Sequence, residues 1–462
     1  MKHISRKLAT ALLATTMAAT AGAQEMRSTY FLSTNNFRHQ MNPALLDDAY
    51  FSIPFFGQIN VGATGNVGLK NFVYKLDGDP RYKYTTFMNP NVSAAEFLGD
   101  MPDRMHTDVY LNYNLFSVGF RGFGGVNLIE LNLRSNTNIA LPKELFEFMK
   151  CTGEKEHYQL EDIGVRSQNY AELALGHSHK INDRLTVGGK VKFLVGGAYG
   201  DLSVDKLDIT MNGDQWRIQG DARVNAAILD ATLEYEDPSK NAPDGRRRVK
   251  GIDDVAFSLP GFGVALDLGA TFKLNEDLTL SAAVTDLGAI NWKKVHQASS
   301  MGDYTFDGFT DIYVASDHGN QKLGDQFESL GDDLEEMFSV YEDGEGSKSQ
   351  TLAATINVGA EYTLPVYRRL RFGALYTGRL NGIYSHHQGM FAVTVNPLNW
   401  FELSLNTAVG TTGWTTGGAM SLKAKHFNFY IASDRFLGKV SKEFIPLNQA
   451  NANVSFGMTI PL

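Results

Sequence analysis

The last ten residues of the chain, 453–462, carry an apolar side chain at nearly every second position. Small or polar residues separate the apolar ones, which are Val454, Phe456, Met458, Ile460 and Leu462, and Pro461 is the one exception. A period of two places alternate side chains on the two faces of a β-strand. A chain that ends on such a strand is typical of a membrane barrel that closes on its own C-terminus, with lipid outside and a polar interior.

The same alternation recurs in three other segments, at 187–195, 262–273 and 352–364. Each run is about as long as the 9–11 residues that a tilted strand needs to cross a bilayer. Strands of soluble sandwiches are nearer to about 5–6 residues. The composition, with 43% hydrophobic residues, suits both classes. Strand length therefore favours the membrane barrel.

The N-terminus has the layout of a secretory signal peptide. Lys2, Arg6 and Lys7 precede a mildly apolar stretch, and Ala21-Gly22-Ala23 supplies the small residues of a cleavage site. We expect residues 1–23 to be removed. Beyond them no run reaches about 18 apolar residues, so the sequence predicts no transmembrane helix. A secreted chain with barrel strands is expected in the outer membrane of a Gram-negative bacterium.

Short turns alternate with long polar connections along the mature chain, as in outer-membrane barrels. The turns are rich in Asn, Asp and Gly and lie at 182–184, 212–214, 275–277, 365–368, 396–399 and 424–426. The long connections lie at 70–107, 140–168, 229–260, 290–350 and 434–450. The predicted fold is all-β: a transmembrane antiparallel β-barrel of about 14 strands over residues 51–462, with long extracellular loops. The count rises to about 16 if the aspartate-rich pair 201–228 also spans.

Two of the long connections contain helical patterns. Residues 142–149 begin with proline and continue with Leu145, Phe146 and Phe148, which predicts a short helix. Residues 325–338 combine acidic side chains with apolar ones at helical spacing, which predicts an amphipathic helix over the outer mouth. Aromatic residues at predicted strand ends are assigned to interfacial girdles. They are Trp292, Trp400, Phe401, Trp414, Phe427 and Tyr430.

Asn42-Pro43-Ala44 is the most specific short motif, and it lies just before the first strand. Here the chain resembles the long-chain fatty acid transporters of the outer membrane and the related barrels of type IX secretion, which carry Asn-Pro-Ala after a region that plugs the barrel. The stretch Gly261 to Asp286, which runs into Thr-Asp-Leu-Gly, and Ser433-Asp434 extend the resemblance to a family of uncharacterised outer-membrane barrels. That resemblance implies a transporter-like barrel of about 14 strands with unassigned cargo.

Residues 24–50 are therefore expected to form a plug or hatch segment. The Ala/Gly-rich run that the fatty acid transporters place before their motif is absent, and residues 28–41 are polar and aromatic. Asn42, Pro43 and Ala44 have two interpretations. They form a rigid turn into the first strand, with proline fixing φ and asparagine capping it, or they take part in plugging and gating.

Seven charged residues fall on the polar side of their strands, where a barrel wall faces its lumen. They are Arg134, Glu172, Lys190, Lys192, Asp267, Lys273 and Glu361. Lys or Arg on the lipid side costs about 2–4 kcal/mol at the midplane, so these charges are expected to line the interior. Cross-lumen salt bridges that tie a plug to the wall explain them, and so does a selectivity lining for a charged solute.

Other reactive residues form no complete site. His177 with His179, and His386 with His387, are only pairs, whereas a zinc site needs three or four ligands. Ser178 is followed by His179 and Lys180 and so lacks the nucleophile-elbow pattern. Cys151 is a single cysteine and forms no intramolecular disulfide. We expect no cofactor, no metal and no enzymatic activity.

The sequence predicts passive transport of a small, partly hydrophobic molecule across the outer membrane. The alternative is a non-transporting barrel that binds secreted or surface proteins, as the type IX resemblance implies, and a sealed structural or lipid-binding barrel is the third hypothesis. Outer-membrane lipid is an expected partner, and the basic run 246–250 is a candidate contact for lipopolysaccharide phosphates. The net charge of −9 argues against nucleic-acid binding.

Overall fold

The structure is a computed structural model. It describes residues 26–52, 54, 56–75, 84–152, 154–212, 215–228, 230–256, 258–300, 313–314, 339–436 and 452–462. The expected signal peptide (1–23) and the expected helix at 325–338 both lie outside the described residues.

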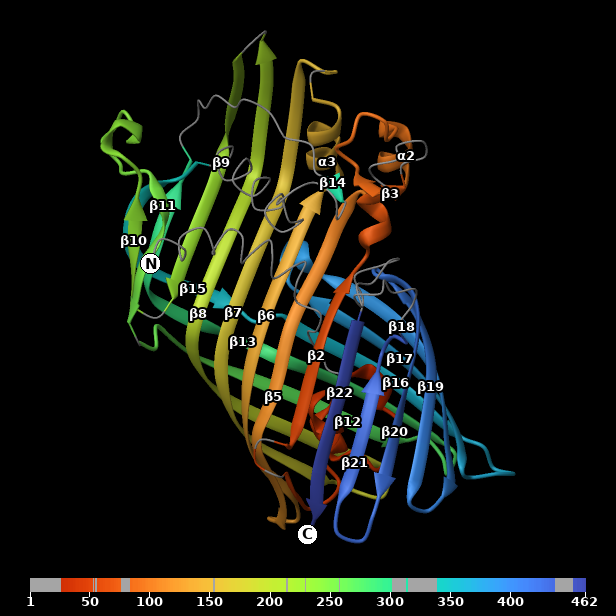
Figure 1. Ribbon diagram of the computed structural model, residues 1–462. Helices are drawn as coiled ribbons and strands as arrows, with labels where there is room; N and C mark the ends of the chain where they lie inside the picture. The colour runs from red at the N-terminus through yellow and green to blue at the C-terminus, as the bar shows by residue number, and fades with distance from the viewer. Residues whose placement is uncertain are drawn as a thin grey trace.

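Fourteen antiparallel strands close into a barrel, which confirms the predicted fold class (Figure 1). Eleven of them run unbroken: β5 (Arg104–Gly122), β6 (Gly125–Pro142), β7 (His157–Lys180), β8 (Leu185–Asn212), β13 (Leu278–Ser299), β17 (Leu370–Leu380), β18 (His386–Leu398), β19 (Phe401–Gly410), β20 (Gly413–Lys423), β21 (Asn428–Ser433) and β22 (Ala452–Pro461). The C-terminal strand β22 closes the ring, because it pairs with β21 on one side and with the first strand on the other.

Each of the other three barrel strands consists of two segments. β1 (Tyr50–Ser52) and β2 (Gln58–Gly65) lie end to end between β22 and β5. β9 (Gln215–Ile228) and β12 (Gly261–Lys273) lie end to end between β8 and β13. β15 (Tyr341–Thr351) and β16 (Ala354–Thr363) share β13 in the same way. At the break between β9 and β12 a hairpin of β10 (Asp230–Tyr235) and β11 (Val249–Ala256) leaves the wall.

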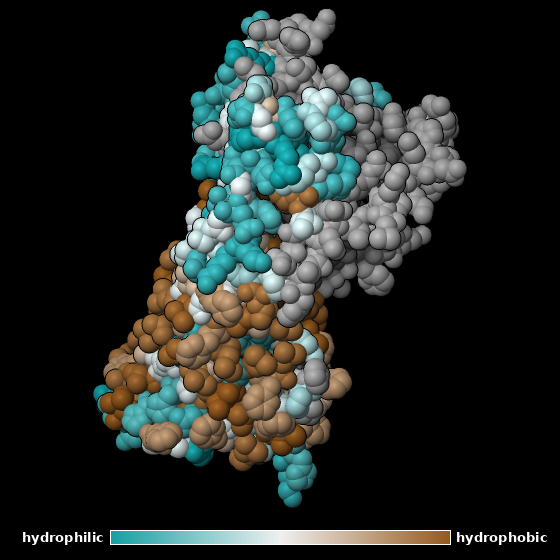
Figure 2. Space-filling view, turned by 90° about the vertical axis from the view of Figure 1, so that its left-hand side faces the viewer, coloured by the Kyte–Doolittle hydropathy of each residue, from teal (hydrophilic) through white to brown (hydrophobic). Residues whose placement is uncertain are grey.

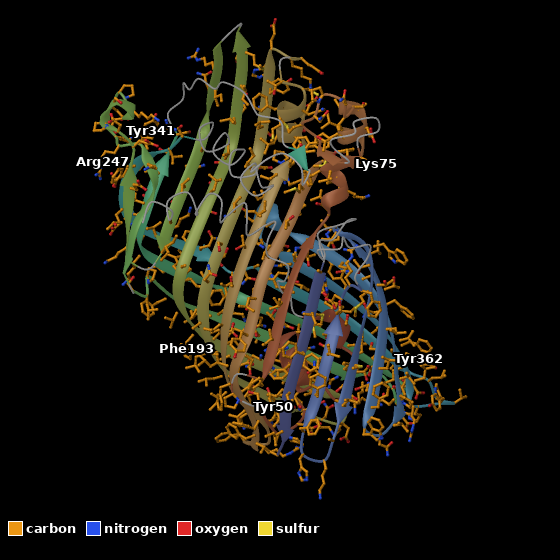
Figure 3. All side chains as sticks on the ribbon, in the orientation of Figure 1. Tyr50, Lys75, Phe193, Arg247, Tyr341 and Tyr362 are labelled. Atoms are coloured by element: carbon orange, nitrogen blue, oxygen red, sulfur yellow. The ribbon has the colours of Figure 1, made fainter. Side chains whose placement is uncertain are left out.

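Side chains alternate between lipid and lumen along the lower barrel, as the period of two predicts. On β12, Phe262 and Val264 are 54% and 60% exposed, whereas Ala265 and Asp267 are fully buried on the inner face. On the face drawn in Figure 2 the outer residues merge into an apolar belt over the lower half of the molecule, and Phe193 and Tyr362 lie at this level in Figure 3. None of the described helices has the length and apolarity to cross a membrane.

One side of the barrel rises far above the apolar belt (Figure 1). β7 and β8 have 24 and 28 residues, more than twice the roughly 9–11 that a crossing strand needs. The aspartate-rich hairpin at 201–228 belongs to this upper part, so it projects from the membrane and leaves fourteen spanning strands. The long connections 140–168 and 290–350 are correspondingly shorter than predicted, because their ends continue as strands whose outward face is polar rather than apolar.

Short elements cover the upper ends of β5 to β8 (Figure 1). They are η4 (Leu69–Asn71), β3 (Val73–Lys75), β4 (Tyr84–Thr86), β14 (Tyr313–Val314), α2 (Ala94–Gly99) and α3 (Lys143–Lys150). The predicted helix at 142–149 is therefore confirmed as α3, with Pro142 at its N-cap. Phe97, Phe148 and Leu160 are the centre of a hydrophobic core beneath these elements. Burial raises the pKa of the Cys151 thiol at the end of α3.

A bulge on β13 reverses which residues face the lumen. Thr285 is buried on the inner face, yet Asp286 adopts φ 60° and the pairing with β12 shifts there by one residue. Such a shift turns the side chains that follow it to the other face, here as far as the next irregularity between Trp292 and Val295. Trp292 is consequently fully buried and stacks on Tyr199 at 5.3 Å. Its assignment to an interfacial girdle is wrong, and so is that of Tyr430, which is buried on the inner face of β21.

Candidate functional site

Residues 26–49 lie inside the lower barrel as a series of short turns (Figure 1). These are η1 (Arg27–Thr29), η2 (Asn36–Gln40) and η3 (Pro43–Leu45). Asparagine starts two of the turns, because the side chain of Asn35 accepts from the backbone N–H of Phe37 and that of Asn42 from Ala44. We call residues 26–49 the lumen segment.

Asn42-Pro43-Ala44 fits a notch between two glycines of the wall. Gly188 on β8 and Gly269 on β12 are register partners. A Cβ atom on Gly188 would lie 2.4 Å from the carbonyl carbon of Pro43, and one on Gly269 would lie 2.0 Å from Asn42 Oδ1. The Nδ2 group of Asn42 also donates to the Ala270 carbonyl at 3.3 Å. Only glycine leaves room for this motif at both positions.

Asp434 anchors the start of the lumen segment. Its carboxylate accepts hydrogen bonds from the backbone N–H and Nε of Arg27, both at 3.1 Å. It also accepts from the backbone N–H and Oγ of Ser28, both at 2.6 Å. One buried carboxylate therefore holds two successive residues of the segment.

Glu402 holds the next stretch of the segment. Its carboxylate accepts from the backbone N–H of Ser33 at 3.2 Å and of Thr34 at 3.0 Å, as well as from both hydroxyls. Arg371 on β17 neutralises Glu402 and also pairs with Glu361 at 3.2 Å. Glu361 thus supports the second anchor indirectly.

Aromatic side chains hold the middle of the lumen segment through hydrogen bonds and ring packing. They lie near the bottom of the barrel, where Tyr50 is labelled in Figure 3. His39 Nε2 lies 2.7 Å from the Tyr50 hydroxyl, which lies 2.6 Å from Ser117 Oγ on β5. Phe37 packs edge-on against Tyr50 with the ring centroids 5.9 Å apart. All of these side chains are buried.

A network of buried charges covers the wall beside the lumen segment. Lys192 lies 2.8 Å from Asp267, 2.7 Å from Asp286 and 3.8 Å from Glu172. Arg134 pairs with Glu172 at 3.3 Å, and Lys190 pairs with Glu130 at 2.8 Å. Buried ions require partners of this kind, since an isolated charge in a low-dielectric interior costs several kcal/mol.

The structure brings five of the seven predicted lumen charges into this network and separates the other two. Glu361 belongs to the Arg371 pair, and Lys273 is exposed at the end of β12, next to the turn at 274–277. Sequence reasoning missed several members. Glu130 follows the alternation of its strand and could have been found, whereas the β13 bulge hides Asp286 from any simple period of two.

A cavity of about 50 Å³ lies in the lumen above the segment. Arg27 and Met41 of the lumen segment form part of it, and the rest comes from β5, β6, β7, β13, β16 and β17 and from residues 352, 353 and 381 next to these strands. Most of the wall side chains are asparagine, glutamine or arginine. The interior above the segment is therefore polar.

The other candidates from the sequence form no comparable site. The rings of His177 and His179 lie 5.7 Å apart near the lower rim, and His386 pairs with Asp108 at 3.1 Å. Within the described ranges, no group of three or more His, Cys, Asp or Glu is arranged to hold a metal ion. Arg247 stacks on Tyr235 at 3.6 Å and pairs with Glu342 at 2.6 Å, so the basic run is partly neutralised within the upper sheet (Figure 3).

A closed barrel with an apolar belt, a polar lumen and both ends of the ring at its lower rim defines an outer-membrane β-barrel. Residues 43–434 match the family of unknown function DUF5723, and the chain belongs to this family. The predicted resemblance to an uncharacterised barrel family is thereby confirmed.

Several solved barrels are similar to the chain over most of its length. The Ralstonia pickettii toluene transporter TbuX is 8% identical, with 92% of each chain covered and a TM-score of 0.39. The Pseudomonas putida toluene transporter TodX is 10% identical, with 95% of each covered and a TM-score of 0.39. A Pseudomonas aeruginosa FadL homologue is 10% identical, with 91% of each covered and a TM-score of 0.33. No curated protein matches the sequence. At this similarity the cargo of the transporters does not carry over to the chain.

Proposed function

We propose that this barrel lets a small molecule cross the outer membrane passively through its lumen, with residues 26–49 as the gate. The observation that carries the proposal is the way in which the segment is held. It is held to the wall by hydrogen bonds, ion pairs and close packing, centred on Asp434, Glu402 and the notch at Gly188 and Gly269. Contacts of this kind can be broken and remade one at a time, as a gate requires.

The polar lumen supports the same proposal. A barrel of fourteen strands encloses more space than its own wall side chains fill, and a cavity lies directly above the gate. Movement of the lumen segment would connect this cavity with the periplasmic side. The partly hydrophobic cargo predicted from the sequence stays a prediction that flux measurements decide.

Cross-linking the lumen segment to the barrel wall tests the proposal. Ser28 Oγ lies 2.8 Å from Asn406 Nδ2 on β19, so Ser28→Cys with Asn406→Cys, in a Cys151→Ser background, places two thiols within reach of a short bifunctional reagent. The matched control is Thr394→Cys with Ser404→Cys, which joins two neighbouring wall strands whose hydroxyls are 3.0 Å apart. Solute flux into proteoliposomes is measured before and after bridging.

We expect bridging of the first pair to reduce solute flux strongly and bridging of the control pair to leave it unchanged. Flux that is the same with a bridged and a free lumen segment would overturn the gating role. The absence of flux of any small solute through the unbridged protein would overturn transport itself.

The upper part of the molecule favours one second function, the binding of a secreted or surface protein. It has its own hydrophobic core around Phe97 and Phe148, and the hairpin β10–β11 projects sideways from it (Figure 1). These features exceed what a pore needs. Replacing residues 230–256 by a short flexible linker should then abolish co-purification of a specific partner without changing barrel folding, and unchanged co-purification would remove this candidate.

A further inference from the structure

The lumen cavity above the gate has an unequal charge lining. Four arginines and one aspartate contribute to it, together with five asparagines and one glutamine. The arginines are Arg27, Arg134, Arg166 and Arg379, and the aspartate is Asp286. The carboxylates that pair with three of the arginines, namely Asp434, Glu172 and Asp201, are not part of the lining. Cationic groups therefore face the cavity while their counter-charges lie behind them.

The one lining carboxylate is already engaged. Asp286 pairs with Lys192 at 2.7 Å, on the side of the buried network. Because Lys192 already compensates its charge, Asp286 attracts a further cation into the cavity only weakly. The electrostatic balance inside the cavity favours a bound anion.

Arg379 differs from the other three arginines. Among the described residues it donates a hydrogen bond to an amide, from Nη2 to Asn136 Oδ1 at 3.4 Å, and its Nε is buried without a partner. No described carboxylate forms a salt bridge with it, whereas Arg27, Arg134 and Arg166 each have one. A guanidinium presents five N–H donors in a planar fork that matches an oxyanion. Arg379 is therefore the lining arginine with N–H donors available to a bound anion.

The amide side chains complete the polar surroundings. Asn136 and Asn138 come from β6, and Asn381 follows β17 directly. Asn381 Nδ2 donates to Asn138 Oδ1 at 3.0 Å, which fixes both groups next to Arg379. Amides can donate hydrogen bonds to an anion without adding charge.

We propose that this cavity binds a small oxyanion, the carboxylate or phosphate group of a small solute, with Arg379 as its main contact. The proposal deepens the proposed function, because it names the class of solute that would use the lumen. A volume of about 50 Å³ accommodates an anionic group of a few heavy atoms. Four of the lining residues are apolar and most are polar, so the cavity suits a charged group better than a hydrocarbon chain.

Calorimetric titration of the detergent-solubilised full chain with inorganic phosphate, and separately with acetate, tests the proposal. Ethylene glycol is the uncharged probe. The test variant is Arg379→Gln, and the matched control is Arg369→Gln, which removes the same charge from the exposed lower turn, where Arg369 donates to the Pro397 carbonyl and Asn399.

We expect at least one of the two anions to bind, with an affinity that falls about tenfold or more in Arg379→Gln and stays unchanged in Arg369→Gln. Comparing phosphate with acetate shows which oxyanion is preferred. No binding of either anion, or equal losses in both variants, would overturn the proposal. Arg379→Lys and Arg379→Leu separate loss of the charge from loss of the planar guanidinium, since Arg379→Lys should retain part of the affinity and Arg379→Leu none.

The titration is independent of flux. Anion binding without solute flux would leave the cavity site standing and remove the transport function. Flux that is indifferent to Arg379→Gln, together with absent binding, would remove the oxyanion site and leave transport standing.

Discussion

Gly188 on β8 is in direct contact with Pro43 of the lumen segment, and a Cβ atom on this glycine would lie 2.4 Å from the proline carbonyl carbon. The clash would be with backbone, which cannot rotate away as a side chain can. The neighbouring Gly189 has no atom nearer than 3.6 Å to such a Cβ. A substitution at Gly188 therefore affects the contact with the lumen segment, whereas the same substitution at Gly189 affects only the strand.

Gly188→Ala is expected to displace the Asn42-Pro43-Ala44 turn from its notch and to destabilise the protein by about 1–3 kcal/mol, the usual cost of overpacking. Trypsin cleavage at Arg38, which is buried in the seated segment, should become faster. Gly189→Ala should leave the cleavage rate at the wild-type value. Equal rates in the two variants would show that the notch does not hold the segment.

Asp434→Asn is expected to release the start of the segment. The substitution removes the negative charge that accepts from Arg27 and Ser28, and each hydrogen bond to a charged group contributes about 1.5–3 kcal/mol. Urea unfolding in lipid vesicles should show a clear loss of stability. Asp183→Asn, in an exposed turn, is the control and should behave like wild type. Retained stability in Asp434→Asn would contradict the anchor.

Lys192→Met tests the buried network. The variant leaves Asp267 and Asp286 without their cation, and breaking a buried pair in this way costs about 3–5 kcal/mol. Lys155→Met, which removes an exposed pair with Glu147 above the membrane, should cost less than about 1 kcal/mol. Similar unfolding free energies for the two variants would mean that the network around Lys192 is open to solvent.

Thiol labelling of intact cells tests which end of the barrel faces the outside of the cell. In a Cys151→Ser background, Ser239→Cys lies in the exposed tip of the β10–β11 hairpin and Asp183→Cys in the lower turn between β7 and β8. A membrane-impermeant maleimide should label the first in whole cells, and the second only after the outer membrane is permeabilised. The reverse pattern would place the upper part of the molecule in the periplasm.

Much of the barrel was predictable because lipid imposes a strict period of two. The runs at 262–273 and 352–364 and the C-terminal strand all appear in the structure as β12, β16 and β22. Above the belt that constraint disappears from the outer face, because Val204, Leu207 and Ile209 of β8 still pack into the upper hydrophobic core while the opposite face meets water. The upper strands therefore lack the outward apolar residues of a membrane-spanning strand, and the sequence predicted loops where strands continue.

The interior was harder to predict than the wall. Lys192 and Asp267 are visible as charges on the polar side of their strands, but nothing local shows that Asp286 joins them. A one-residue bulge moves Asp286 and Trp292 to the inner face. The anchors Glu402 and Asp434 depend on contacts across more than 360 residues of sequence, which no local pattern encodes.

The occupation of the lumen by residues 26–49 is tested most directly by single-channel conductance in planar bilayers. We expect a variant lacking residues 26–46, which retains the heat-modifiable mobility of a folded barrel, to form large and stable open channels where the full chain conducts little. Equal conductance of the full chain and the folded deletion variant would contradict the account, because the lumen would then be open or closed regardless of the segment.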